Sequence, residues 1–307
     1  MGKHLFRPLF LLAALLLPSR SEGGGASAEP FPDTNSGRLV RDQVGRQVRV
    51  VSSPRRIVSL APSVTETLFA LEAGDRVVGV TDFCDYPPGV MAKTRIGGMV
   101  NPNWEAILGL KPDLLVATTS GNDRNVVAQA QVLRLPLYFL DTPDIESLLD
   151  SLTRLGDLLG SPSPAEALRI DLTARLLEIE RKIPSGPRPT VLFLVWGDPL
   201  MVPGRGTFLN DALKRSGCAS ITSDGPPGWP TYNLETLLVR DPQWILAADQ
   251  NAPFLEGLQQ HPGWRTLDAV RRGRTVLVSP ALERPAPRVV EAMEQLQEML
   301  GRKREGH

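Results

Sequence analysis

The feature that most constrains the fold of this chain is an uninterrupted helical stretch near its middle. Residues 164–183 contain no glycine and no internal proline, and apolar side chains recur every three or four positions, at Leu168, Leu172, Leu176, Ile179 and Ile183. This spacing places the five side chains on one face of a helix. At about 1.5 Å per residue, the stretch spans roughly 30 Å, the width of a small domain. It therefore predicts a long rod against which the rest of the chain packs.

Local signals predict both ends of this helix. Ser163 and Glu166 fit a capping box, in which each side chain bonds to the other residue's backbone, and Pro164 suits the first helical position. Arg181 brings positive charge to the last turn, where it suits the helix dipole, and Pro184 follows.

Two similar segments flank the predicted helix. Residues 103–117 and 233–247 align without a gap, and an asparagine, a glutamate, a leucine, a proline and an alanine coincide in register. Each segment is typical of a capped helix, a proline break and a strand buried in a parallel sheet. Any α/β chain can yield such units by chance, so the alignment alone leaves coincidence open. It favours two lobes of similar plan.

The alternation of strands and helices predicts an α/β fold with mostly parallel sheets covered on both faces. We expect two Rossmann-like lobes, an N-terminal lobe at 38–160 and a C-terminal lobe at 187–301, joined by the helix within 161–186. Residues 29–37 resemble an unstructured lead, and 302–307 form a basic tail. A stiff helix between the lobes predicts only a small hinge movement.

The N-terminus predicts secretion to the periplasm. Basic residues are followed by an apolar run at 9–17 and by the small-x-small sequence of residues 26–28, so residues 1–28 are typical of a signal peptide. The run is shorter than the roughly 20 residues that span a bilayer, and an uncleaved anchor is the alternative. No cysteine follows the run, so a lipid-anchored form is not indicated.

Charge and composition argue against several functions. The 34 basic and 34 acidic residues balance, which indicates neither a nucleic-acid partner nor an anionic membrane. Beyond the predicted signal, the histidines are His261 and His307, too few for a three-histidine metal site.

The two cysteines, Cys84 and Cys218, fall in different predicted lobes. We expect two free, buried thiols, with an interlobe disulfide as the alternative.

Motifs for catalysis are absent from the sequence. It contains no Gly-x-Ser-x-Gly elbow, no phosphate-binding loop and no dinucleotide glycine fingerprint. We therefore predict a protein that is not an enzyme and has no catalytic residues. A secreted α/β hydrolase is the alternative from another class.

Aromatic residues gather on the loops where a ligand site is expected. Ligands of open α/β sheets bind beyond the carboxyl ends of the strands. Although only 6% of the chain is aromatic, the loops predicted there hold the aromatic residues Tyr86, Trp196, Trp229 and Tyr232, together with Met99. Such side chains suit a wide, flat, partly apolar ligand held by stacking, or they could simply pack the loops down.

Glu105 and Glu235 form a pair of acids, one in each predicted lobe. Each stands two residues after an asparagine that can cap a helix. Two interpretations stay open: the carboxylates stabilise the positive end of their own helices, or they meet basic residues of a partner protein.

These residues give the chain a resemblance to the solute-binding proteins of ABC importers whose two lobes are joined by one long helix, and which serve cobalamin, haem and siderophores. The likeness is strongest to the cobalamin (vitamin B12)-binding members and runs from about residue 38 to residue 300. The matching segments are 56–66, 78–81, 84–88, 103–114, 228–230 with Glu235, and 283–288.

The resemblance implies a monomeric receptor that captures cobalamin or a related corrinoid in a cleft between the lobes and passes it to an ABC permease. The residues that match cleft-lining positions of the family are Ser63, Tyr86, Met99, Trp196, Trp229 and Arg284. Glu105 and Glu235 match positions at which the family presents acids to arginines of the permease.

The resemblance also leaves the ligand partly open. Met99 stands where close cobalamin binders can carry an aromatic residue, and Pro280 stands where a polar contact is expected, so a related corrinoid or a different chelate is an alternative. The scarcity of histidine fits cobalamin, because its cobalt can keep its own axial base. A haem or ferric-siderophore receptor of the same fold is the other alternative, with Tyr86 as an iron ligand.

Overall fold

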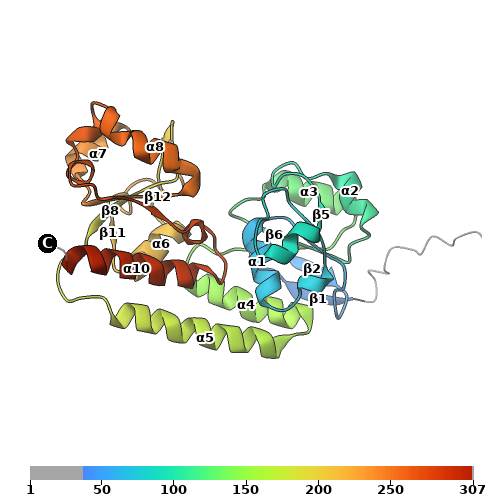
Figure 1. Ribbon diagram of the computed structural model, residues 1–307. Coiled ribbons are helices and arrows are strands. Elements are labelled where there is room, and N and C mark those ends of the chain that lie inside the picture. The colour runs from blue at the N-terminus through green and yellow to red at the C-terminus, as the bar shows by residue number, and fades with distance from the viewer. Residues whose placement is uncertain (1–36, 306–307) are drawn as a thin grey trace, which may run out of the picture. The chain divides into compact units, whose positions relative to one another are not determined.

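The computed structural model describes residues 37–305, and the predicted signal peptide at 1–28 lies outside these residues. The first lobe is built on a parallel sheet in the order β5-β4-β3-β6-β7 (Figure 1). Its strands are β3 (Ile57–Ser59), β4 (Val77–Val80), β5 (Thr94–Arg95), β6 (Leu114–Thr118) and β7 (Leu137–Leu140). Its helices are α1 (Pro62–Ala70), α2 (Trp104–Gly109), α3 (Arg124–Val132) and α4 (Ile145–Leu159), and an antiparallel hairpin of β1 (Arg38–Arg41) and β2 (Gln47–Val50) precedes them.

The second lobe repeats this plan with a parallel sheet in the order β11-β8-β12-β13. Its strands are β8 (Thr190–Leu194), β11 (Ala219–Ser220), β12 (Trp244–Ala248) and β13 (Thr275–Val278), with a small hairpin of β9 (Trp196–Gly197) and β10 (Leu200–Met201). Its helices are α6 (Phe208–Arg215), α7 (Leu234–Arg240), α8 (Ala252–Gly257), α9 (Asp268–Arg271) and α10 (Val289–Glu305). Short 3₁₀ turns occupy 74–76, 88–92, 249–251, 258–260, 264–266 and 280–283.

Both faces of the first sheet are buried, as the continuous apolar strands predict. Successive residues of β6 alternate between two apolar clusters: Leu114 and Val116 belong to one, and Leu115 and Ala117 to the other. The strand is buried along its whole length. The predicted α/β fold with parallel sheets is therefore confirmed.

The long helix α5 (Pro162–Arg181) runs beneath α4 and α10 (Figure 1). Its buried face consists of Ala165, Leu172, Leu176 and Ile179. Three of the five predicted residues therefore lie on this face, whereas Leu168 is half-buried and Ile183 lies beyond the end of the helix. The buried side chains share one apolar cluster with residues of both sheets. None of the helices in the part of the chain that the structure describes is long and apolar enough to cross a membrane.

The predicted start of this helix is wrong by two residues. The helix begins at Pro162 and its N-cap is Ser161, whose side chain makes no capping hydrogen bond. Glu166 pairs with Arg169 instead, at 2.6 and 2.8 Å, so the Ser163–Glu166 capping box does not form. The first turn tolerates proline because its backbone N–H groups have no partner within the helix, and Pro162 takes the position predicted for Pro164.

The two aligned segments do form equivalent units, α2 followed by β6 and α7 followed by β12. Asn103 caps α2 by accepting a hydrogen bond from the backbone N–H of Ala106 at 3.0 Å, and Asn233 caps α7 by accepting one from Thr236 at 2.8 Å. Cys84 and Cys218 are both buried and form no disulfide, so the interlobe disulfide that was the alternative is not present.

The buried face of α5 predicts how this helix contributes to stability. Leu172→Ala should lower the free energy of unfolding by about 2–5 kcal/mol, because it leaves a cavity where both lobes meet the helix. Leu177→Ala is the matched control on the same helix, since Leu177 is 62% exposed and its loss should cost less than about 0.5 kcal/mol. Urea denaturation measures both values, and equal losses would contradict this packing.

Candidate ligand-binding site

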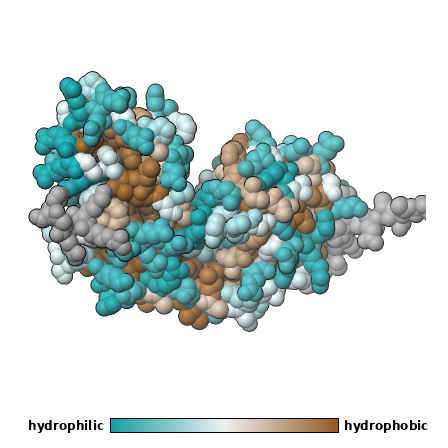
Figure 2. Space-filling model, in the orientation of Figure 1, coloured by the Kyte–Doolittle hydropathy of each residue, from teal (hydrophilic) through white to brown (hydrophobic). Residues whose placement is uncertain are grey.

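Each sheet has a point at which the strand order reverses. In the first lobe β4 lies on one side of β3 and β6 on the other, and in the second lobe β11 and β12 flank β8 in the same way. Ligands bind at such points, beyond the carboxyl ends of the strands. The surface is hollowed between the two lobes (Figure 2). The candidate site therefore consists of the loops that follow β3, β4, β6, β8, β12 and β13.

A buried asparagine ties the loops together at each reversal point. Asn122 donates from Nδ2 to the carbonyl of Leu60 at 2.9 Å and to that of Met99 at 2.8 Å. In the second lobe Asn251 donates from Nδ2 to the carbonyl of Val195 at 2.9 Å. Both follow the strand of the aligned unit by a few residues. Sequence reasoning missed them, because extending the ungapped alignment sets Asn122 against Ala252 and Asn251 against Gly121.

The loop that carries Tyr86 is anchored by buried polar groups. Cys84 is 1% exposed, and its Sγ lies 3.2 Å from the hydroxyls of both Thr65 and Thr81. Arg95 donates to the carbonyl of Cys84 at 2.7 Å. The thiol therefore holds the loop down, while Tyr86 remains 41% exposed.

Two tryptophans of the second lobe, Trp196 and Trp229, are exposed. Trp196 begins β9, two residues after the end of β8, is 52% exposed, and donates from Nε1 to the carbonyl of Asp198 at 2.8 Å. Trp229 is 42% exposed. It follows Gly228, whose carbonyl accepts a hydrogen bond from the backbone of Gly204 at 2.8 Å. The Trp196 ring is thus held by a hydrogen bond, whereas at Trp229 it is the backbone of the loop that is held.

Ser63 and Met99 offer less surface than the three aromatic residues. Ser63 lies in the first turn of α1 and is 7% exposed. Met99 is half-buried and packs on the core, over Gly121, where any side chain would collide with its Cε. Their predicted contact with a ligand remains a prediction.

Arg284 is engaged by acids of the first lobe. Its Nη1 donates to Asp85 Oδ1 at 2.6 Å and to Glu66 Oε1 at 2.8 Å, and its Nη2 donates to Asp85 Oδ2 at 2.9 Å. These hydrogen bonds lower the pKa of Asp85 below its ordinary value, although burial opposes the change. The side chain predicted to meet the ligand therefore joins the two lobes.

Glu283, beside Arg284, carries an oxygen without a partner. Its Oε2 accepts a hydrogen bond from Gln250 at 2.8 Å, whereas Oε1 is buried and has no hydrogen bond among the described residues. Burial raises the pKa of this carboxyl group. Gln250 follows β12 and Glu283 follows β13, so the pair lies at the carboxyl edge of the second sheet.

Glu105 and Glu235 occupy equivalent places in the first turns of α2 and α7. Both are exposed, and neither forms an ion pair with a residue that the structure describes. Their charges are therefore free to interact with a partner.

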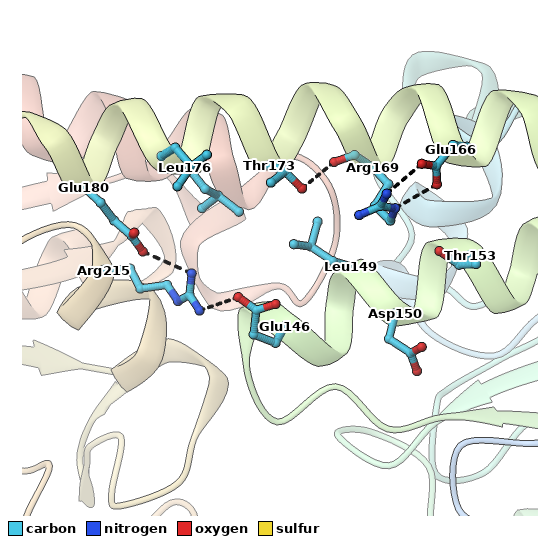
Figure 3. Close-up of a pocket in the computed structure, with 11 residues that line it drawn as sticks. Glu146, Leu149, Asp150, Thr153, Glu166, Arg169, Thr173, Leu176, Glu180 and Arg215 are labelled. Atoms are coloured by element: carbon cyan, nitrogen blue, oxygen red, sulfur yellow. Dashed lines mark hydrogen bonds and ion pairs between the residues drawn. The ribbon is translucent and has the colours of Figure 1, made fainter.

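A second hollow lies between α4 and α5. It has a volume of about 700 Å³ and holds none of the predicted site residues. Arg215 of α6 donates to Glu146 of α4 at 2.7 Å and to Glu180 of α5 at 3.1 Å, and so closes one end of this groove (Figure 3). The groove is lined by an ion-pair network that fastens the second lobe to both helices.

Comparison with known proteins defines the class. Residues 57–282 match the family described as periplasmic binding protein, and the chain belongs to this family. The family membership expected from the sequence is thereby confirmed.

Individual relatives agree with this assignment. The vitamin B12-binding protein of Vibrio cholerae is 27% identical over 78% of this chain and 87% of its own length. An uncharacterized ABC transporter substrate-binding lipoprotein of Bacillus subtilis is 30% identical over 94% of both chains. The crystal structure of the periplasmic vitamin B12 binding protein of Vibrio cholerae superposes with a TM-score of 0.72, at 26% identity over 81% of this chain and 97% of that one. A periplasmic haem binding protein from Pseudomonas aeruginosa superposes with a TM-score of 0.73, at 29% identity over 80% and 91%.

The unpartnered oxygen of Glu283 predicts a pH-dependent effect on stability. A raised pKa means that the folded protein binds the proton more tightly than the unfolded chain, so the ionised group lowers stability once the pH rises through its folded pKa. Glu283→Gln should therefore raise the free energy of unfolding at pH 7, by up to about 1 kcal/mol. The gain should shrink as the pH falls through the raised folded pKa and should be gone below 4.5, the ordinary pKa, because the wild-type group is then neutral in both the folded and the unfolded state.

Urea denaturation at several pH values measures this gain. Glu235→Gln, at an exposed glutamate, is the control and should change stability little at any pH. A gain for Glu283→Gln that is the same at pH 4 and pH 7 would show that the ionised carboxylate is not the destabilising group.

Proposed function

We propose that this protein is an extracytoplasmic receptor that binds cobalamin or a related corrinoid between its lobes and delivers it to the permease of an ABC importer. The observation that carries this proposal is the set of exposed aromatic side chains of Tyr86, Trp196 and Trp229, which lie beyond the strands of both sheets. Membership of the periplasmic binding protein family and the relatives named vitamin B12-binding proteins support it. Residues 1–28 would direct the chain across the membrane.

The chemistry of these loops suits a corrinoid. A corrin ring is broad and largely flat, so it can bury apolar area against the aromatic rings. Because the Trp196 ring is held by its hydrogen bond to the carbonyl of Asp198, binding need not order this ring, which lowers the entropic cost of binding. The protein offers surface and orientation, and no catalytic step is required of it.

Haem is the second candidate ligand. The observation that favours it is Tyr86, whose phenol is 41% exposed and could coordinate iron, together with the similarity to a periplasmic haem binding protein. The two ligands make different demands on the same residue: haem would use the hydroxyl oxygen, whereas a corrinoid would use the ring.

Glu105 and Glu235 are proposed to dock the receptor on the permease. Each is exposed in the first turn of an equivalent helix, and neither is neutralised by a described residue. Opposite charges across an interface chiefly set orientation and the rate of encounter. A pair of acids, one on each lobe, would make docking depend on the arrangement of both lobes.

Calorimetry of the mature protein with cyanocobalamin tests the ligand. We expect saturable binding, weakened by about 1–3 kcal/mol in Trp196→Ala and in Trp229→Ala, because each loses a large stacked side chain. Leu177→Ala, at an exposed leucine of α5, is the control and should bind like the wild type. Unchanged affinity in both tryptophan variants would contradict the proposed site.

Absorption titration with haemin separates the second candidate. Haem ligation by Tyr86 would give a shifted spectrum that Tyr86→Phe abolishes. Binding of cyanocobalamin should instead survive Tyr86→Phe, which keeps the ring. A wild-type protein that binds haemin and not cyanocobalamin would replace the corrinoid with haem in the proposed function.

The docking role is tested with Glu105→Ala combined with Glu235→Ala. This double variant should bind the ligand normally and fail to support uptake, because only the permease contact is lost. The matched control removes two exposed acids of α5, Glu166→Ala with Glu178→Ala, and should support normal uptake. Equal uptake by the two double variants would refute docking through Glu105 and Glu235.

A further inference from the structure

Two arginines of the second lobe meet two acids of the first lobe. Glu66 of α1 has a side chain only 3% exposed. Its Oε1 accepts hydrogen bonds from Arg284 Nη1 and Arg288 Nη2, both at 2.8 Å, and its Oε2 accepts one from Arg288 Nε at 3.0 Å. Arg284 also pairs with Asp85 through both of its Nη atoms. The formal charges of the four groups cancel.

Arg288 has a second contact that the ion pairs do not require. Its guanidinium carbon lies 3.9 Å from the centre of the Tyr86 ring, the geometry of a cation–π contact. One face of the ring is therefore covered by Arg288. A ligand that stacks on Tyr86 can use only the opposite face, so Arg288 decides which way the exposed face points.

The network holds two neighbouring residues of one loop. Asp85 accepts a pair of hydrogen bonds from Arg284, and one face of the Tyr86 ring is covered by Arg288. Both arginines follow β13, in the segment that leads into α10, whereas the loop belongs to the first lobe. The position of a first-lobe ring thus depends on the second lobe, through a buried carboxylate that both arginines share.

Resting on the proposed function, we propose that Arg288, Glu66 and Arg284 are positioning residues, which fix the Tyr86 ring for the ligand from across the lobe boundary. This assigns Arg284 a different role from the direct ligand contact that the family resemblance implies. Its Nη1 donates to two carboxylates and its Nη2 donates to Asp85, so both Nη atoms of the guanidinium already form hydrogen bonds within the protein. The network sets the ring before any ligand arrives.

A double-mutant cycle on cyanocobalamin binding distinguishes positioning from direct contact. Arg288→Met should weaken binding about fivefold or more in the wild-type background and have no further effect once Tyr86→Leu has removed the ring. Arg284→Met should behave in the same way. The matched control is Arg175→Met, because Arg175 makes an equally paired contact with Glu294 of α10 at 2.7 and 2.9 Å, and it should leave binding unchanged. Losses that persist in full in the Tyr86→Leu background would show direct ligand contact and overturn the proposal.

A measurement without ligand keeps this test separate from the proposed function. The chain has three tyrosines, so 3-fluorotyrosine labelling yields few ¹⁹F resonances, and Tyr86→Phe identifies one of them. In Arg288→Met and in the milder Glu66→Gln, the Tyr86 resonance should shift or broaden, while that of Tyr138, which is 2% exposed, stays in place and reports an intact fold. An unchanged Tyr86 resonance would overturn the positioning role. Failure of the wild type to bind cyanocobalamin would instead contradict the proposed corrinoid ligand and leave the positioning of the Tyr86 ring to be judged from the ¹⁹F spectra.

Discussion

The structure depends on the burial of one face of α5 against both lobes. Leu172, Leu176 and Ile179 belong to the same apolar cluster as Val116 of the first sheet and Phe193 of the second. Burying a leucine or isoleucine side chain contributes roughly 1.5–3 kcal/mol, so the helix stabilises each lobe and their union at once. One face of each sheet thus belongs to a core that both lobes share, whereas the opposite face packs on a separate cluster within its own lobe.

Ion pairs complete this connection on two sides. Arg215 joins α6 to α4 and α5, and Arg284 with Arg288 joins the β13–α10 segment to α1 and the Tyr86 loop. Exposed ion pairs contribute little to stability, but Glu66 is almost fully buried, and a buried charge must keep all of its partners. The second network therefore favours one arrangement of the β13–α10 segment against α1 and places Arg288 over the ring of Tyr86.

Much of the fold could be predicted because its signals are local. The apolar period of α5, the asparagine caps of α2 and α7, and the continuous apolar strands β6 and β12 each depend on neighbouring residues. The start of α5 was misplaced because Pro162 and Pro164 both suit a first turn, and local rules do not choose between them. Of the candidate site, Tyr86, Trp196 and Trp229 were predicted because aromatic residues outside the core strands stand out in a chain with few of them, and all three are exposed.

The sequence by itself determined the two-lobed α/β plan, the long helix and the family, because periodicity, caps and family motifs are read from adjacent residues. Only the tertiary structure decided which side chains remain available for a ligand. Arg284 and Glu66 are 218 positions apart, and no local pattern shows that their charges are satisfied by each other. The same holds for Asn122, which binds the carbonyl of Leu60, and for Arg288 on the ring of Tyr86. A motif names the chemical group at a position, whereas its partners are set by how distant segments pack.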